Sequence, residues 1–394
     1  MRIIIPSYHE ENLFETIHSL ETCAPSHHIV IVYIVLNHCE SDDKDIKNLH
    51  LLQMAKLGHL NSIESHISIR PLLFEMDDKK GGVGLARKFG MDRAAMDAVS
   101  EGNSQELLVC LDADCRVAKN YLQVLQQAEL EQTNIKALSI RYEHEFVGLN
   151  GKHKEGIIGY EGFLRYYVLS LRWAQYPFSH QTVGSAMAVR ADTYLKSGGM
   201  NTKKAGEDFY FLHKLMPLGG FATISGTTVF PSPRLSNRVP FGTGKAMQRW
   251  LENDLKSYLV PHFEAFVQIK KFCETVSSVN RTTEANTFFD KLPFSIVEFI
   301  GSEKIVSAFS QAKQNSSNDI NLQKRLFKWF DGFKVMKFLH YYRDNIEPDI
   351  ALEDAVTGLF QTKGLSLTFQ SMEDLLLILR ELELDSNDYK HALY

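Results

Sequence analysis

Short apolar runs alternate with helical patterns over about the first 230 residues of this 394-residue chain. The apolar runs predict strands at 3–6, 29–36, 67–69, 107–111 and 136–140. The helical patterns predict helices at 10–22, 43–56, from 81–84 to about 99, 118–132 and 159–174. Strands that alternate with helices favour a parallel sheet, because each helix returns the chain so that the next strand can run in the same direction. We therefore expect an α/β fold with a mostly parallel sheet and helices on both faces.

The pattern changes at about residue 243, where strand signals fade and helical periodicity takes over. We expect a first domain at 1–245 and a mainly helical C-terminal region at 246–394, with loops at 282–287 and 311–321. The stretch 322–343 is basic, aromatic and amphipathic, and we expect its helix to bury the apolar face in the protein. An alternative interpretation is peripheral association with an anionic membrane surface.

Composition excludes several classes of function. The net charge of −5 lacks the basic excess that nucleic-acid-binding proteins show, so we expect no nucleic-acid partner. The longest apolar run, at 29–36, is far too short to be a transmembrane segment. The five cysteines form no C-x-x-C motif and are interpreted as reduced thiols of a cytoplasmic protein. Because a strand is predicted from residue 3, we expect no signal peptide before it.

Paired acidic residues, Asp112 and Asp114, follow the strand predicted at 107–111. Residues two apart on a strand share a face, and open α/β sheets bind ligands at the carboxyl ends of their strands. Two carboxylates placed there suit a divalent metal, Mn²⁺ or Mg²⁺, that carries a substrate diphosphate. The alternative is that Asp112 caps the following helix and Asp114 is solvated.

Four segments in a fixed order carry a family resemblance: IIIPSYHEE at 3–11, KKGGVGLARKFGMDRA at 79–94, VCLDADC at 109–115, and 183–215, which includes Glu207 and Asp208. Together they resemble the GT-A glycosyltransferases, most closely the inverting family 2. The resemblance covers about residues 1–245. It implies a GT-A (Rossmann-like) fold and transfer of a hexosyl or N-acetylhexosaminyl group from a nucleotide-sugar, with a UDP-sugar favoured, to an acceptor hydroxyl with inversion.

The resemblance places the nucleotide at the ends of the first strands. The family's first strand ends in a proline with an acidic residue nearby, which here implies Pro6, Ser7 and Glu10. Its second strand usually ends in an Asp that contacts the base or ribose. Here Asn37 takes that place, and its amide can both donate and accept hydrogen bonds. Arg87 matches an arginine that faces the nucleotide or its phosphates, although a solvated helix residue after a glycine turn is the alternative.

The same resemblance assigns the chemistry to four carboxylates. It gives Asp114 to the metal, and Asp112 to the metal site or the ribose. It gives the general base to Asp208, with Glu207 beside it to cap or orient. One base and one metal are sufficient for inversion, since a metal-bound diphosphate needs no protein acid to leave. Both acids could instead simply favour a helix N-terminus.

A loop rich in Gly, Pro and Arg follows at 231–244, and we expect Arg234 or Arg238 in it to reach the diphosphate. Arg249-Trp250 resembles the end of a Q-x-x-R-W motif, but Ala246 replaces its glutamine, so a membrane polymer synthase is not expected. The acceptor stays open: an unknown saccharide, a lipid-linked acceptor or a small molecule. Two alternatives to the transferase are a catalytically silent GT-A-like binding protein and a sugar nucleotidyltransferase.

Overall fold

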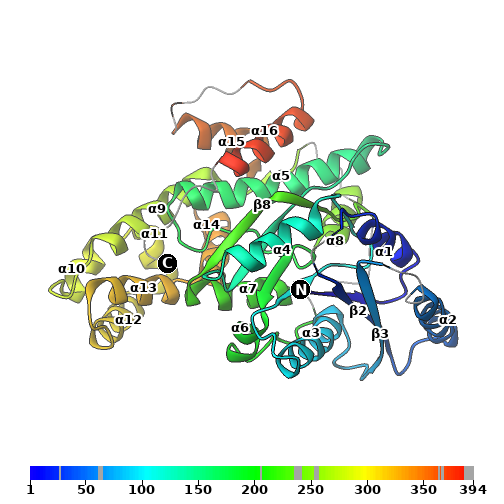
Figure 1. The fold of residues 1–394 in the computed structure, drawn as a ribbon. Coiled ribbons are helices and arrows are strands. Elements are labelled where there is room, and N and C mark those ends of the chain that lie inside the picture. Colours follow the sequence, from blue (N-terminus) through cyan, green and yellow to red (C-terminus); the bar gives the residue numbers. More distant parts are fainter. Residues whose placement is uncertain are drawn as a thin grey trace. The chain divides into compact units, whose positions relative to one another are not determined.

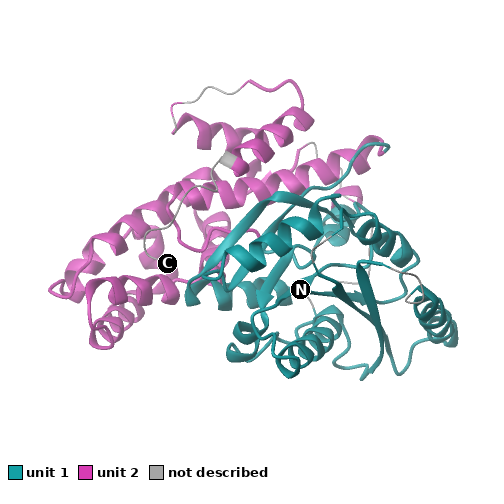
Figure 2. Ribbon diagram, viewed as in Figure 1, with its two compact units in different colours: residues 1–148, 182–249 teal, residues 149–181, 250–394 magenta. Residues whose placement is uncertain are grey.

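A computed structural model describes residues 1–25, 28–60, 65–204, 206–234, 242–252, 257–362, 364 and 368–385. The chain divides into two compact units (Figure 2). Unit 1 consists of Met1–Gly148 and Thr182–Arg249, and unit 2 of Leu149–Gln181 and Trp250–Tyr394. The domain boundary expected near 245 stays a prediction. No helix in the described ranges is long and apolar enough to cross a membrane.

A single eight-stranded sheet forms the centre of the described part of unit 1, in the order β3-β2-β1-β4-β7-β6-β8-β5. Its strands are β1 (Arg2–Ser7), β2 (Val30–Cys39), β3 (Ile67–Met76), β4 (Leu107–Cys110), β5 (Arg116–Val117), β6 (Ala137–Tyr142), β7 (Met187–Arg190) and β8 (Phe221–Phe230). Strands β3, β2, β1 and β4 are mutually parallel, as are β6 and β8. Strand β7 runs antiparallel between β4 and β6, and β5 is antiparallel to β8.

Helices flank this sheet, as Figure 1 shows. They are α1 (Leu13–Glu21), α2 (Lys44–Leu60), α3 (Val83–Ser100), α4 (Tyr121–Glu131), α6 (Ala191–Lys196), α7 (Glu207–Leu215), the short 3₁₀ helix η1 (Met216–Leu218) and α8 (Thr243–Glu252). Helix α3 lies directly on β1 and β2, because a Cβ added at Gly90 would come within 2.6 Å of Ile4 and 2.8 Å of Val35. The expected α/β class with a mostly parallel sheet is confirmed. Strands β5, β7 and β8 were not among the predicted strands.

Unit 2 is mainly helical, as expected of the C-terminal region. Its helices are α5 (Gly151–Trp173), α9 (Phe263–Ser278), α10 (Ala285–Asp290), α11 (Phe294–Ile300), α12 (Ser302–Gln314), α13 (Asp319–Trp329), α14 (Gly332–Asn345), α15 (Leu352–Gln361) and α16 (Met372–Asp385). A short antiparallel pair, β9 (Leu259–Val260) and β10 (Ile350–Ala351), joins them.

Helix α16 is tied to α5 by buried ion pairs. Glu161 accepts hydrogen bonds from Arg165 Nε and Arg380 Nε, both at 2.8 Å. Arg165 also pairs with Glu383 of α16 at 2.5 Å. Buried charges of this kind require partners, so these contacts fix where α16 packs along α5.

Three expectations for the C-terminal region were wrong in detail. The predicted loop at 282–287 gives way to α10 from Ala285, and the loop at 311–321 is reduced to the residues between α12 and α13. The stretch 322–343 is two helices, because Asp331 caps α14 by accepting a 2.9 Å hydrogen bond from Lys334 N. Its apolar side chains are nevertheless buried within unit 2, among them Leu322, Leu326, Phe330, Val335, Phe338 and Leu339.

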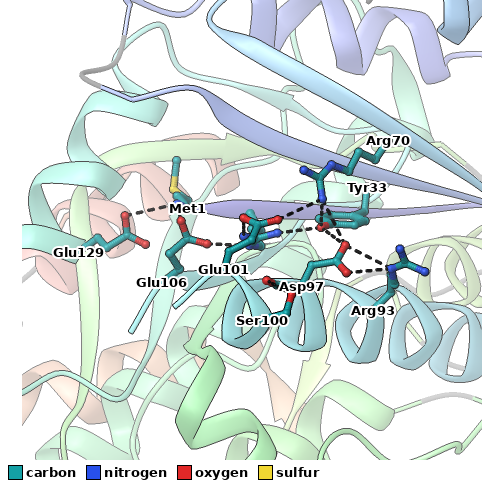
Figure 3. A network of polar contacts seen from close by, with 10 residues as sticks. Met1, Tyr33, Arg70, Arg93, Asp97, Ser100, Glu101, Glu106 and Glu129 are labelled. Atoms are coloured by element: carbon teal, nitrogen blue, oxygen red, sulfur yellow. Dashed lines mark hydrogen bonds and ion pairs between the residues drawn. The ribbon is translucent and has the colours of Figure 1, made fainter. Parts of the chain in front are cut away.

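A network of charges fastens the amino end of β1 (Figure 3). The guanidinium of Arg2 is fully buried and donates to Glu106 at 2.6 Å, to Tyr33 Oη at 2.9 Å and to Glu101. Burial alone would lower the pKa of Arg2, but the hydrogen bonds to Glu101 and Glu106 hold that pKa above its ordinary value. Tyr33 Oη in turn donates to Asp97 Oδ2 at 2.7 Å. The network therefore joins β1 and β2 to the C-terminal end of α3.

Replacing Arg2 should weaken unit 1 markedly. We expect Arg2→Met to lower the free energy of unfolding by about 2–3 kcal/mol, because the acids and the hydroxyl it contacts lose a buried charged donor. Arg93→Met is the matched control, since Arg93 belongs to the same network through Asp97 but is 59% exposed, and it should cost less than about 0.5 kcal/mol. Urea denaturation measures both variants, and equal losses would contradict the role given to Arg2.

Candidate functional site

Polar side chains gather where β1, β2 and β4 end. Because these strands are parallel, Ser7, Asn37 and Asp112 lie at the same edge of the sheet. Pro6 and Ser7 are buried there, and within the described part of the chain the Ser7 hydroxyl has no hydrogen-bond partner. When the Asn37 amide is oriented so that its hydrogen-bonding groups are satisfied, its nitrogen donates to the backbone carbonyls of Val35 and Ser7, each at 3.2 Å. Asn37 therefore holds the two strand ends together.

Arg87 joins two of the predicted carboxylates. Its guanidinium is 3% exposed and donates to Asp112 Oδ1 at 2.6 Å and to Glu207 Oε1. Burial would lower the pKa of Arg87, but the charges of Asp112 and Glu207 keep it above its ordinary value. Contact of Arg87 with a nucleotide stays a prediction. Its contacts in the structure are with protein carboxylates, which it links across α3, the end of β4 and the start of α7.

Helix α7 opens with the acidic pair, after Gly206 in the left-handed conformation with a φ of 68°. Glu207 is buried against Arg87, whereas Asp208 retains some exposure and accepts a 2.7 Å hydrogen bond from Phe209 N. Burial is the largest cause that raises the pKa of Asp208 to about 7, and the negative charge of Glu207 is the second. The positive charge of Arg87 opposes the shift. A carboxylate with this pKa can accept a proton near neutral pH.

Arg234 bridges the other pair of predicted carboxylates. Its Nη1 donates to Glu10 Oε1 at 2.9 Å, and its Nη2 lies 2.9 Å from Asp114 Oδ2. Glu10 is buried, while Arg234 keeps 32% of its side chain exposed. Burial is the largest cause that raises the pKa of Asp114 to about 6, and the negative charge of Asp112 is the second. The positive charge of Arg234 opposes the shift.

The structure therefore brings seven predicted residues into two linked groups: Arg87 with Asp112 and Glu207, beside Asp208, and Arg234 with Glu10 and Asp114. Asn37 contacts Ser7 separately. Arg238 lies outside the described residues. The two acids of the D-x-D motif are thus held by different arginines.

Sequence reasoning missed two residues that shape this site. A Cβ added at Gly184 would come within 3.0 Å of both Arg87 Nη1 and Asp208 Oδ2, so only glycine fits there without displacing a charged group. Thr16 donates from Oγ1 to the Ala113 carbonyl at 2.8 Å and holds the middle of the D-x-D. The available signal for Gly184 was its place at the start of the segment 183–215 that carries the family resemblance, but nothing in the sequence around Thr16 singles it out.

The donor set suits a metal that arrives with its substrate. Asp112 and Asp114 supply hard carboxylate oxygens, which Mg²⁺ and Mn²⁺ prefer, and such sites are commonly completed by phosphate oxygens and water. Over the described ranges no group of three or more His, Cys, Asp and Glu side chains is arranged to hold a metal ion. A metal site made of one or two carboxylates and a substrate diphosphate uses these oxygens and needs no group of three protein ligands.

The solved structures to which this chain is similar include two glycosyltransferase complexes. Staphylococcus aureus TarS, residues 1–349, in complex with UDP-GlcNAc is 15% identical, covers 84% of this chain and 90% of its own, and gives a TM-score of 0.44. The mannosyltransferase PcManGT from Pyrobaculum calidifontis in complex with GDP-Man and Mn²⁺ is 13% identical, covers 97% and 80%, and gives 0.37. No family model and no curated protein matches the chain. Likeness at these values assigns no activity, so a functional assignment depends on the side chains of unit 1.

The close packing of α3 on the segment before α7 can be tested at a glycine. A Cβ at Gly84 would lie 2.2 Å from the Lys203 carbonyl oxygen and 3.1 Å from Glu207 Cβ. We expect Gly84→Ala to lower the free energy of unfolding by about 1–3 kcal/mol, because the backbone must shift to admit the methyl group. In Gly58→Ala the new methyl group meets nothing within 4 Å. That helix variant should gain about 0.5–1 kcal/mol. Urea denaturation of both variants checks this, and a Gly84→Ala protein of unchanged stability would contradict it.

Proposed function

We propose that unit 1 is the catalytic part of a glycosyltransferase. It would move a hexosyl or N-acetylhexosaminyl group from a nucleotide-sugar, with a UDP-sugar favoured, to an acceptor hydroxyl with inversion. The observation that carries the proposal is the arrangement at Arg87. One buried guanidinium holds Asp112 of the D-x-D and Glu207, next to a carboxylate, Asp208, whose pKa is raised to about 7. In this arrangement the proton acceptor would lie beside the diphosphate.

The nucleotide would lie over the ends of β1 and β2. Pro6, Ser7 and Asn37 form this edge, where open α/β sheets bind their ligands. The buried Ser7 hydroxyl, which has no hydrogen-bond partner among the described residues, supplies one hydrogen-bonding group there. Glu10 lies three residues further on and is held by Arg234. This placement agrees with the roles that the family resemblance implies for these residues.

Asp114, with Asp112 beside it, would hold a divalent metal, Mn²⁺ or Mg²⁺. When bound there, such an ion neutralises the negative charge that develops on the departing nucleoside diphosphate. Arg234 pairs with Asp114, so its guanidinium would be in reach of the same diphosphate. Arg234 would orient the phosphates directly, and Asp112 and Asp114 would act on them only through the ion that they hold.

Asp208 would act as the general base. It takes the proton from the acceptor hydroxyl as the hydroxyl oxygen forms a bond to the anomeric carbon. The bond from that carbon to the diphosphate oxygen breaks at the same time, and its electron pair leaves with the nucleoside diphosphate. Attack from the face opposite the leaving group inverts the anomeric centre. Glu207, fixed by Arg87, positions the first turn of α7 and hence Asp208.

The base assignment predicts a large loss of turnover. After a thermal-shift screen with UDP, GDP, CDP and their sugars has identified the donor, Asp208→Asn should reduce the rate of transfer about 10²–10⁴-fold. Donor binding should change little, because Asn keeps the shape and the nucleotide contacts lie elsewhere. Glu207→Gln should reduce stability more than turnover, since it weakens the pair with Arg87. A near-normal rate in Asp208→Asn would require another base or a retaining mechanism.

The raised pKa of Asp208 predicts opposite effects of pH on rate and on stability. The rate should rise as the pH increases through about 7, because only the deprotonated carboxylate accepts a proton. The folded protein binds this proton more tightly than the unfolded chain, whose Asp pKa is about 4, so this group's contribution to stability falls as the pH rises between those values. Asp208→Asn should therefore be more stable than the wild type at pH 8 but not at pH 4. Thermal unfolding at the two pH values measures this, and an equal difference at both would contradict the shift.

A further inference from the structure

We propose that Arg234 is an exchangeable cation. In the free protein its guanidinium neutralises Glu10 and Asp114, and on donor binding it gives up Asp114 to a divalent metal and turns to the diphosphate. This inference rests on the proposed function and deepens it. It predicts that the site admits its metal together with a diphosphate and only weakly without one.

The contacts of Arg234 show that it occupies the position of a counter-ion. Its Nη1 donates to Glu10 Oε1 at 2.9 Å, and its Nη2 donates to Glu10 Oε2 and lies 2.9 Å from Asp114 Oδ2. Glu10 is buried, so its negative charge requires a positive partner close by. An ion that binds Asp114 must therefore either share the carboxylate with this guanidinium or displace it.

Comparison with Arg87 indicates which arginine can move. Arg87 is 3% exposed and is anchored on its other side by Glu207, so its guanidinium cannot leave Asp112 without breaking a buried ion pair. Arg234 is 32% exposed, and water can reach it. Charge pairs that solvent reaches exchange at lower cost than buried ones. The two acids of the D-x-D then have separate functions, Asp112 as a fixed group and Asp114 as the exchangeable ligand.

Synergy between metal and diphosphate follows from the charges. If the metal bound alone, the guanidinium of Arg234 would lose its contact with Asp114 and gain no new anionic partner. A diphosphate supplies new oxygen acceptors, which arginine binds well through two parallel hydrogen bonds. Each ligand should therefore raise the affinity for the other by the same factor. The part of the chain described here has no group of three or more candidate protein ligands, which agrees with a metal that needs phosphate oxygens.

Isothermal titration calorimetry with Mn²⁺, inorganic pyrophosphate and both together tests the exchange without any turnover. Mn²⁺ alone should bind the wild-type protein weakly, and added pyrophosphate should raise the affinity of the protein for Mn²⁺. Arg234→Gln should bind Mn²⁺ alone about tenfold more tightly or better, a change equivalent to about 1.4 kcal/mol. The same variant should bind pyrophosphate more weakly and lose most of the synergy. Complexes of Mn²⁺ with pyrophosphate in solution are common to all variants and cancel in the comparison.

Two further variants make the result decisive. Arg116→Gln removes the same charge from an arginine that lies close to the D-x-D in sequence but pairs with Glu145, and it should leave every affinity unchanged. Adding Asp114→Asn to Arg234→Gln should abolish the gained Mn²⁺ affinity. An Arg234→Gln protein whose affinity for Mn²⁺ alone is unchanged or lower would overturn the proposal. A protein that shows the synergy but binds no nucleotide-sugar would instead contradict the proposed function.

Discussion

The site depends on one buried charge, the guanidinium of Arg87. A cation removed from water is stable only if anions replace the water, and here Asp112 and Glu207 do so. These three residues come from α3, the end of β4 and the start of α7, so the ion pairs fix three elements of unit 1 at one point. Gly84 and Gly184 allow this approach, because a side chain at either would collide with the backbone or with a charged group.

A consequence of this arrangement is that Asp208 carries an unfavourable charge. Glu207 already occupies the nearest positive partner, and burial together with the charge of Glu207 raises the pKa of Asp208 to about 7. The same shift that suits a general base therefore reduces stability at higher pH. Asp114 shows a smaller version of the effect, with burial and Asp112 raising its pKa to about 6. The charged forms of Asp208 and Asp114, which the proposed mechanism uses, thus lower the stability of the folded protein.

Strands β1, β2 and β4 could be predicted because they are mostly buried and appear as uninterrupted apolar runs. Only the start of β3, at 67–69, was predicted, because the rest of that strand is partly exposed and carries Arg70, Pro71 and Glu75. The run at 29–36 became β2, which extends to Cys39. Strands β5, β7 and β8 were missed: the first two are short, and β8 contains several polar residues and a glycine. The helix break at Phe330 was missed because the apolar periodicity hid the capping role of Asp331.

The sequence by itself determined the α/β class and the identity of the candidate site residues, since apolar periodicity and motif order are local properties of the chain. The partners of those residues could not be obtained in this way. Arg87 meets Glu207 across 120 positions and Arg234 meets Glu10 across 224. Contacts between residues so far apart, and the burial that shifts the pKa values of Asp114 and Asp208, depend on how the strands and helices pack together. Only the tertiary structure decided that one acid of the D-x-D is held by a buried arginine and the other by a partly exposed one.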